Sequence, residues 1–124
     1  MIYMAGNEIE EKKVGLRQIA KATGTPEPFA AKVLQQLVKS KLLDSYKGPS
    51  GGFKLVKNNI ALFDIVEAID GRDIMERCIL GLVDCSNESP CPVHSRYVLI
   101  RKQLRDTLLS TNILDFDSEI KKLF

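Results

Sequence analysis

The chain has 124 residues, of which 44% are hydrophobic and 27% are charged, a composition that suits a soluble protein with one modest core. No apolar run reaches the roughly 20 residues that a membrane span needs, and the first residues lack the basic and apolar regions of a secretory signal. We therefore expect a cytoplasmic protein without a membrane partner, and nothing in the sequence indicates a small-molecule substrate.

The charge is unevenly distributed along the chain, although the net charge is only +2. Residues 12–57 contain ten lysines and arginines against only Glu27 and Asp44, which gives this segment a net charge of +8 and leaves −6 for the remainder. Such an asymmetry favours a polyanion-binding half joined to a half with another task. A solvated lysine-rich surface is the alternative interpretation of the charge alone.

A helix-turn-helix is predicted within the basic segment. Leu16, Ile19 and Ala20 have helical spacing, and Gly24 is expected to end that helix. Two helices joined by a tight glycine turn are typical of a helix-turn-helix, whose second helix reads DNA.

The second helix of this motif is expected to run to about Ser40, with Thr25 as its cap and Pro26 at its first position. Its two faces are predicted from the helical period. The buried face is expected to hold Phe29, Val33, Leu34, Leu37 and Val38, and the opposite face Pro28, Ala31, Lys32, Gln35, Gln36 and Lys39.

A β-hairpin is predicted directly after this helix. Its strands are expected at residues 43–47 and 53–56, separated by the sequence GPSGG, and a hairpin at this place is the wing of a winged helix. The glycines allow the backbone to approach a DNA groove, although an ordinary hairpin turn explains them equally well. Residues 61–70 are predicted to form an amphipathic helix that ends at Gly71 and packs under the wing.

All three cysteines and the only histidine lie close together in the sequence. Cys78, Cys85, Cys91 and His94 have the spacing C-x6-C-x5-C-x2-H, and such soft ligands suit an iron–sulfur cluster or zinc. A thiol switch without a metal is a further alternative, and His94 could instead cap the helix that follows. We expect no catalytic residue, because nothing near Cys91 and His94 would orient the imidazole or bind an oxyanion.

A longer helix is predicted at residues 95–110. Its apolar stripe is too long for a small domain to cover, so we expect Val98, Leu104 and Leu108 to pair with the same helix of a second chain. A helix that folds back on its own core is the alternative. The tail, residues 115–124, is predicted to be a short amphipathic turn.

The predicted fold is mostly α with a small β-hairpin wing. We expect a winged helix-turn-helix domain at residues 1–71, a cysteine-rich loop at 72–94, and a dimerisation helix and tail at 95–124. In this order the motifs resemble the BadM-type or "Rrf-two" winged-helix transcriptional regulators, typified by the iron–sulfur cluster regulator and the nitric-oxide-sensing repressor. The resemblance covers nearly the whole chain. It rests on IA at 19–20, PF at 28–29, VL at 33–34, Leu37, LL at 42–43, KGPSGGFKL at 47–55, DIVEAIDG at 64–71 and the three cysteines.

The resemblance implies a homodimeric transcriptional repressor that binds double-stranded DNA and senses iron–sulfur, redox or nitric oxide status. Cys78, Cys85 and Cys91 would hold an iron–sulfur cluster, with 2Fe–2S favoured over 4Fe–4S, and His94 falls where a variable fourth ligand would lie. Six residues separate the first two cysteines, where five is common, so the spacing does not fix the cluster type. The DNA contacts implied are Arg17, Thr25, Pro28, Phe29, Ala31, Lys32 and Gln35 in the helix-turn-helix, and Lys47, Ser50 and Gly51 in the wing.

Overall fold

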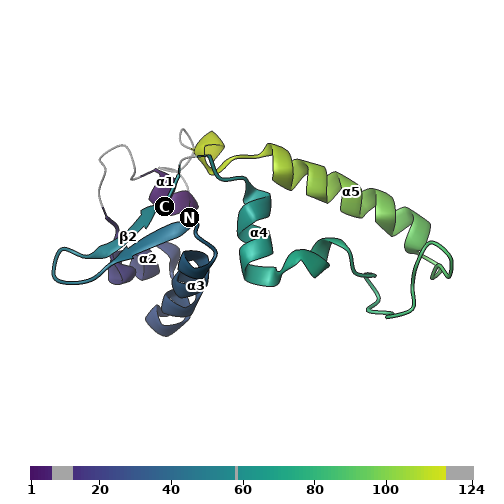
Figure 1. Cartoon of the computed structure of the whole chain (residues 1–124), viewed down its shortest axis with the longest axis horizontal. Helices are drawn as coiled ribbons and strands as arrows, with labels where there is room; N and C mark the ends of the chain where they lie inside the picture. Colours follow the sequence, from purple (N-terminus) through teal and green to yellow (C-terminus); the bar gives the residue numbers. More distant parts are fainter. Residues whose placement is uncertain (7–12, 58, 117–124) are drawn as a thin grey trace.

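The computed structural model describes residues 1–6, 13–57 and 59–116. Short helices and a two-stranded hairpin form a body at one end, and residues 76–110 extend from it as an arm (Figure 1). In chain order the described elements, with η for a 3₁₀ helix, are α1 (Ile2–Ala5), α2 (Leu16–Thr23), α3 (Glu27–Lys39), β1 (Leu43–Tyr46), β2 (Gly52–Leu55), α4 (Leu62–Asp70), η2 (Arg72–Met75), α5 (His94–Ser110) and η3 (Ile113–Phe116). The mostly helical fold with one antiparallel hairpin confirms the predicted fold class.

Helices α2 and α3 form the helix-turn-helix. Gly24 ends α2 in a left-handed backbone conformation with φ of 64°, which glycine adopts without the clash of a Cβ. Helix α3 begins one residue later than predicted, because Pro26 is its N-cap, and no side chain caps it. The cap predicted for Thr25 is therefore wrong. Its hydroxyl lies 2.9 Å from the Thr23 hydroxyl instead.

The buried face of α3 differs from the predicted one by a rotation of about one residue. Leu34 and Leu37 are buried as predicted, but Phe29 is 61% exposed and Ala30 is buried instead. Ala30, Leu34 and Leu37 are spaced i, i+4 and i+7, so they form one continuous line along the helix. The burial predicted for Phe29 was wrong because the apolar spacing permits either line.

The hairpin after α3 is the predicted wing. Strands β1 and β2 pair antiparallel with Leu43 opposite Leu55, and both residues are buried. The turn between the strands requires a glycine at position 51, because a Cβ there would collide with the carbonyl oxygen of Tyr46. Gly51 therefore has a structural role that is independent of any DNA contact.

Helix α4 was expected to pack under the wing. Its main contacts are with α3, α5 and η2, and its apolar residues pack against the core cluster that includes Leu43 and Leu55 of the wing. Its C-terminal end is held against α3 by Gln36, whose side-chain amide donates hydrogen bonds to the carbonyls of Ala68 and Ile69 at 2.9 and 3.2 Å. Its N-terminal end is closed by Asp64, whose carboxylate accepts the Ala61 N–H at 3.1 Å.

The chain returns to the body at the end of α5. The N–H of Leu62 donates to the carbonyl of Thr111 at 2.9 Å, and the N–H of Ile113 donates to that of Ile60 at 3.0 Å. Ile60 and Ile113 are fully buried, so η3 belongs to the core of the body. The tail predicted at residues 115–124 lies largely outside the described residues, which end at Phe116 in η3.

The structure describes no helix that is long and apolar enough to cross a membrane, in any of its three ranges.

Candidate metal centre and DNA-binding face

The three cysteines meet in the loop of residues 76–93, which joins η2 to α5 at the end of the arm far from the wing (Figure 1). Two backbone turns fold this loop on itself. The N–H of Gly81 donates to the carbonyl of Cys78 at 3.0 Å, and the N–H of His94 donates to that of Cys91 at 3.1 Å. Gly81 has a φ of 72°, which favours glycine at this turn.

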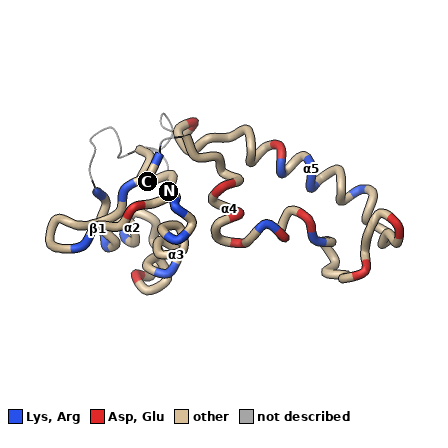
Figure 2. Tube along the Cα trace, viewed as in Figure 1, with Lys and Arg blue, Asp and Glu red and all other residues tan. Residues whose placement is uncertain are grey.

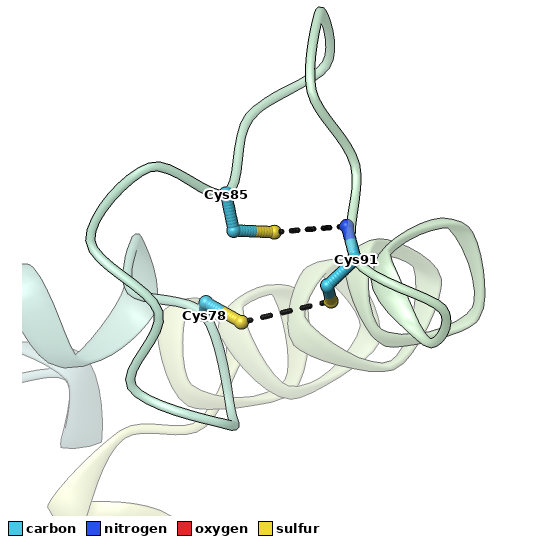
Figure 3. Close-up of side chains that lie close together, drawn as sticks. All are labelled: Cys78, Cys85 and Cys91. Carbon is cyan, nitrogen blue, oxygen red and sulfur yellow. Dashed lines mark hydrogen bonds between the residues drawn. The ribbon is translucent and has the colours of Figure 1, made fainter.

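The three thiols point toward one another, as Figure 3 shows. Their sulfur atoms all lie within 4.8 Å of each other, and the sulfurs of Cys78 and Cys91 are 3.7 Å apart. The sulfur of Cys85 also accepts the backbone N–H of Cys91 at 3.4 Å. All three residues are half-buried and none is in a disulfide, so the sulfurs are free to bind a metal.

The histidine lies beside one of the three thiols. Its Nδ1 is 3.2 Å from the sulfur of Cys85, and its Nε2 is 2.9 Å from the side-chain oxygen of Asn87. An oxygen at this distance accepts a hydrogen bond from the N–H at Nε2, which leaves the Nδ1 lone pair directed at the cysteines. His94 is thus oriented toward the thiols but lies at their edge, beside Cys85.

The thiols differ in acidity. Backbone hydrogen bonding from Leu80 is the largest influence on Cys78, and with Leu82 and the neighbouring thiols it lowers the pKa of Cys78 against the opposing effect of desolvation. The N–H of Cys91 favours the thiolate of Cys85, but desolvation, the neighbouring thiols and the charge of Cys78 outweigh it and raise the pKa of Cys85. Thiolates this close repel one another, and a bound cation would relieve that repulsion.

The donor set fits a soft metal. The three cysteines and His94 line a cavity of about 230 Å³, and Asn87 and Arg101 also line it. Thiolates bound to a single tetrahedral zinc at about 2.3 Å lie about 3.8 Å apart, and the separation of Cys78 and Cys91 is 3.7 Å. Three thiolates with one imidazole suit either zinc or iron in an iron–sulfur cluster. The three cysteines could therefore bind a metal ion or a cluster.

One residue of α5 joins the cysteine loop to the helix. The guanidinium of Arg101 donates hydrogen bonds to the carbonyls of Glu76 and Arg77 at 2.6 and 3.2 Å, and it lies over the ring of Tyr97. The start of the loop is thereby fixed to the middle of α5. Neither Asn87 nor Arg101 was identified from the sequence, because the contacts of both depend on how the loop folds back.

On the body basic residues predominate, whereas the arm carries both signs of charge (Figure 2). The residues predicted to contact DNA all lie on the body. Pro28, Phe29, Lys32 and Gln35 of α3 are exposed, as are Arg17, Lys47 and Ser50, whereas Thr25, Ala31 and Gly51 are half-buried. On α3, positions 28, 31, 32 and 35 follow the helical period and so share one face. Arg17 also lies 3.9 Å from the carboxylate of Glu27.

Two further residues of the wing region were missed by the sequence analysis. The ammonium of Lys13 lies 4.3 Å from the centre of the Tyr46 ring, and both side chains are exposed. Tyr46 pairs with Gly52 beside the hairpin turn, so this contact adds a positive charge at the turn end of the wing. The lysine precedes α2 by several residues, so its sequence position gave no signal that it would lie beside β1.

The three residues predicted to form the dimer interface differ in their exposure to solvent. Leu104 is 48% exposed, whereas Val98 and Leu108 are half-buried. Val98 lines the cysteine cavity, and Leu108 lines an apolar cavity formed with α1–α4. Leu99, Ile100 and Leu109, however, are exposed by 65, 57 and 48%.

Comparison with known proteins gives a family match over residues 1–118, to the Rrf2 model described as "Iron-dependent Transcriptional regulator". A protein of Aquifex aeolicus that is named as an HTH-type transcriptional regulator is 36% identical over 129 residues, which cover all of this chain and 88% of that protein. Protein aau3 of Rhizobium meliloti is 32% identical over 98 residues, covering 77% of this chain and 62% of that protein.

Solved structures show the same fold. The structure of CymR, described as the global cysteine regulator of B. subtilis, superimposes with a TM-score of 0.76 at 24% identity, covering 94% of this chain and 86% of that one. The structure of T. potens IscR superimposes with a TM-score of 0.72 at 22% identity, covering 98% of this chain and 80% of that one. At these identities the likeness concerns the fold.

Proposed function

Because the chain belongs to the Rrf2 family of iron-dependent transcriptional regulators, we propose that it is a cytoplasmic homodimeric repressor whose binding to double-stranded DNA depends on an iron–sulfur cluster. The family is one of transcriptional regulators, and the protein is not an enzyme. The observation that carries the proposal is the convergence of Cys78, Cys85 and Cys91 within 4.8 Å of one another.

The cluster ligands are Cys78, Cys85 and Cys91, with His94 as the fourth. The orientation of Nδ1 toward Cys85 supports His94, because the hydrogen bond from Nε2 to Asn87 fixes the ring. The wide spacing of the cysteines favours a cluster over zinc, and the family resemblance favours a 2Fe–2S cluster over a 4Fe–4S cluster. When bound, the cluster would supply chemistry that responds to iron supply, redox state or nitric oxide.

Two structural links connect the cysteine site to the body. Cys78 and Cys91 hold the two ends of the loop together, and Arg101 ties the loop entrance to α5. Helix α5 then ends in the bridge between Thr111 and Leu62, at the start of α4. A change in the order of the loop thus reaches the body through a rigid helix, and it shifts the population between binding and non-binding states.

DNA is bound by the body. The exposed face of α3 enters the major groove with Lys32 and Gln35, and the wing approaches the flanking minor groove with Lys47 and the backbone at Ser50. Lysines neutralise phosphates, so binding weakens with salt. The concentration of basic residues on the body supports this assignment.

Dimerisation uses α5. This helix has no buried residue in the isolated chain, and it exposes Leu99, Ile100, Leu104 and Leu109. Pairing with the α5 of a second copy about a two-fold axis covers this face and places two reading helices at a fixed spacing.

The cluster is tested on the whole chain purified without oxygen. We expect visible absorption bands with iron and inorganic sulfide in near-stoichiometric amounts. Replacing Cys85 with serine should remove both, while the control Ser95→Ala should retain them. Tighter binding of the cluster-loaded protein to a duplex selected from a random library would complete the case. A wild-type protein without iron and sulfide, even after anaerobic reconstitution, would overturn it.

Zinc is the second candidate, and it is favoured by the 3.7 Å separation of the sulfurs of Cys78 and Cys91, which suits ligands of one tetrahedral ion. In that case the purified protein is colourless and contains one zinc per chain. DNA binding that is then unaffected by zinc removal would assign the metal a purely structural role.

A further inference from the structure

Two of the three cysteines are placed to react with each other. The sulfurs of Cys78 and Cys91 lie 3.7 Å apart (Figure 3), whereas a disulfide needs about 2.0 Å. The segment between them offers little resistance to this small closure. Val83 is 96% exposed and Leu80 is 57% exposed, so no packed core fixes the loop at its present width.

The third cysteine is held by other partners. The sulfur of Cys85 is 3.2 Å from Nδ1 of His94 and accepts the backbone N–H of Cys91 at 3.4 Å. The imidazole is in turn fixed by Asn87 at 2.9 Å. These contacts orient Cys85 toward the imidazole, whereas the sulfur of Cys78 is directed at that of Cys91 (Figure 3).

We infer that the metal-free protein forms a disulfide between Cys78 and Cys91 on exposure to a small disulfide oxidant, while Cys85 remains a thiol. The disulfide itself depends only on the geometry of the thiols. Its consequence rests on the proposed function, because the reaction removes two of the three thiolate ligands at once. The oxidised chain then cannot bind the metal until the disulfide is reduced.

The reaction proceeds by two thiol–disulfide exchanges. The thiolate of one cysteine of the pair attacks a sulfur of the oxidant RSSR, which forms a mixed disulfide and releases one RS⁻. The thiolate of the other cysteine attacks the protein sulfur of that mixed disulfide, which closes the intramolecular bond and releases a second RS⁻. The two protons lost by the protein thiols go to the released thiolates. The protein is oxidised by two electrons and RSSR is reduced to two RSH.

The sequence allows the disulfide to be located directly. Trypsin alone leaves all three cysteines in one peptide between Arg77 and Arg96, but cleavage before Asp84 and after Glu88 separates them. The metal-free full chain is treated with oxidised glutathione, its free thiols are alkylated, and the peptides are identified by mass. We expect residues 78–83 linked to residues 89–96, with a combined mass lower by about 2 Da than the two thiol peptides, and an alkylated peptide 84–88.

Variants separate the pair from the third cysteine. The Cys85→Ser protein should lose its two remaining thiols to the same extent as the wild type, whereas Cys91→Ser should form no intramolecular disulfide. A majority of linked peptides that contain Cys85, or three alkylated cysteines after treatment, would overturn the inference. Glutathione that remains attached to Cys78 without ring closure would also overturn it.

Metal binding provides an independent readout. Zinc or the reconstituted cluster should protect Cys78 and Cys91 from oxidised glutathione, and reduction should restore full metal binding. A disulfide that forms in a protein unable to bind any metal would leave the inferred pair intact and reject the proposed cluster. A metal-binding protein whose apo form does not make this disulfide would reject the inference and leave the cluster standing.

Discussion

The body and the arm are built on different principles. All the side chains that are buried in the described ranges 1–6, 13–57 and 59–116 lie outside the arm, in the body and in the α4–η2 segment against it. Residues 76–110 have none, although this segment contains Ile79, Leu80, Leu82 and Val83, each at least half exposed. The body therefore has its own hydrophobic core, whereas the arm has apolar surface without cover.

The difference indicates where stability and regulation reside. A region with a core stays folded under most conditions, while a region with few buried contacts changes its order at low free-energy cost. In the proposed function this cover comes from outside the chain, from a metal at the cysteines and from a second chain along α5. A sensor benefits from this arrangement, since its state depends on whether those partners are present.

The largest difference in stability between body and arm is expected when a substitution creates a cavity in the body. Leu43 is 1% exposed, so Leu43→Ala should lower the free energy of unfolding by about 2–5 kcal/mol. The matched change in the arm is Val83→Ala, at a side chain that is 96% exposed, which should alter it by less than about 0.5 kcal/mol. Urea unfolding of the reduced, metal-free proteins at one concentration measures both. Equal losses would contradict the division into a packed body and an uncovered arm.

The next largest effect is expected on dimerisation, in which a second chain would bury the exposed apolar face of α5. Leu104→Ala should weaken the dimer by about 3 kcal/mol, on the order of 100-fold in the dissociation constant, because a two-fold dimer buries two copies at about 1.5 kcal/mol each. Analytical ultracentrifugation over a range of concentrations measures this. Leu80→Ala, an equally apolar and exposed change off the helix, is the control. An unchanged dimer in Leu104→Ala would move the interface away from α5.

The body was more predictable from sequence than the arm. Its helices and strands follow from local signals, such as Gly24 after α2 and the glycines of the wing, and tertiary packing altered only details. Phe29 is the clearest example. The helical period permits two adjacent apolar lines, and in the folded chain the line that contains Ala30 is buried whereas Phe29 is exposed. The cap expected from Thr25 failed for a similar reason, since its hydroxyl is paired with Thr23.

In the arm, sequence spacing identified the cysteines but not their surroundings. The soft residues between 78 and 94 predicted a metal centre because few other chemistries use them together. Asn87 and Arg101 gave no such signal. An asparagine in a loop and an arginine on a helix are ordinary surface residues, and their roles arise only when the loop brings Asn87 to His94 and the Glu76 carbonyl to Arg101.

Asn87 therefore offers a smaller, sharper test of the arm. Asn87→Ala should weaken the binding of Zn²⁺ to the reduced apo protein by roughly 10–100-fold, because loss of the partner of Nε2 frees the ring of His94 to turn away from the cysteines. Competition with a chelating dye measures the affinity. Asn87→Asp keeps the acceptor oxygen and should retain most of the binding. Equal affinity in wild type and Asn87→Ala would remove His94 from the ligand set.

The smallest effect is expected from a single charge on the body. Lys32→Ala removes one phosphate contact, so the slope of log K against log salt concentration should decrease by about 0.9, and affinity at physiological salt should fall by about 1 kcal/mol, roughly fivefold. The matched control, Lys102→Ala, removes the same charge from the arm and should leave the slope unchanged. Fluorescence anisotropy with a duplex selected from a random library provides both slopes. Long-range electrostatic attraction would respond to either lysine, so only a decrease in slope that is confined to Lys32→Ala assigns the DNA contact to α3. Equal decreases in both variants would mean that the electrostatic field of the whole chain, rather than this helix face, determines the binding.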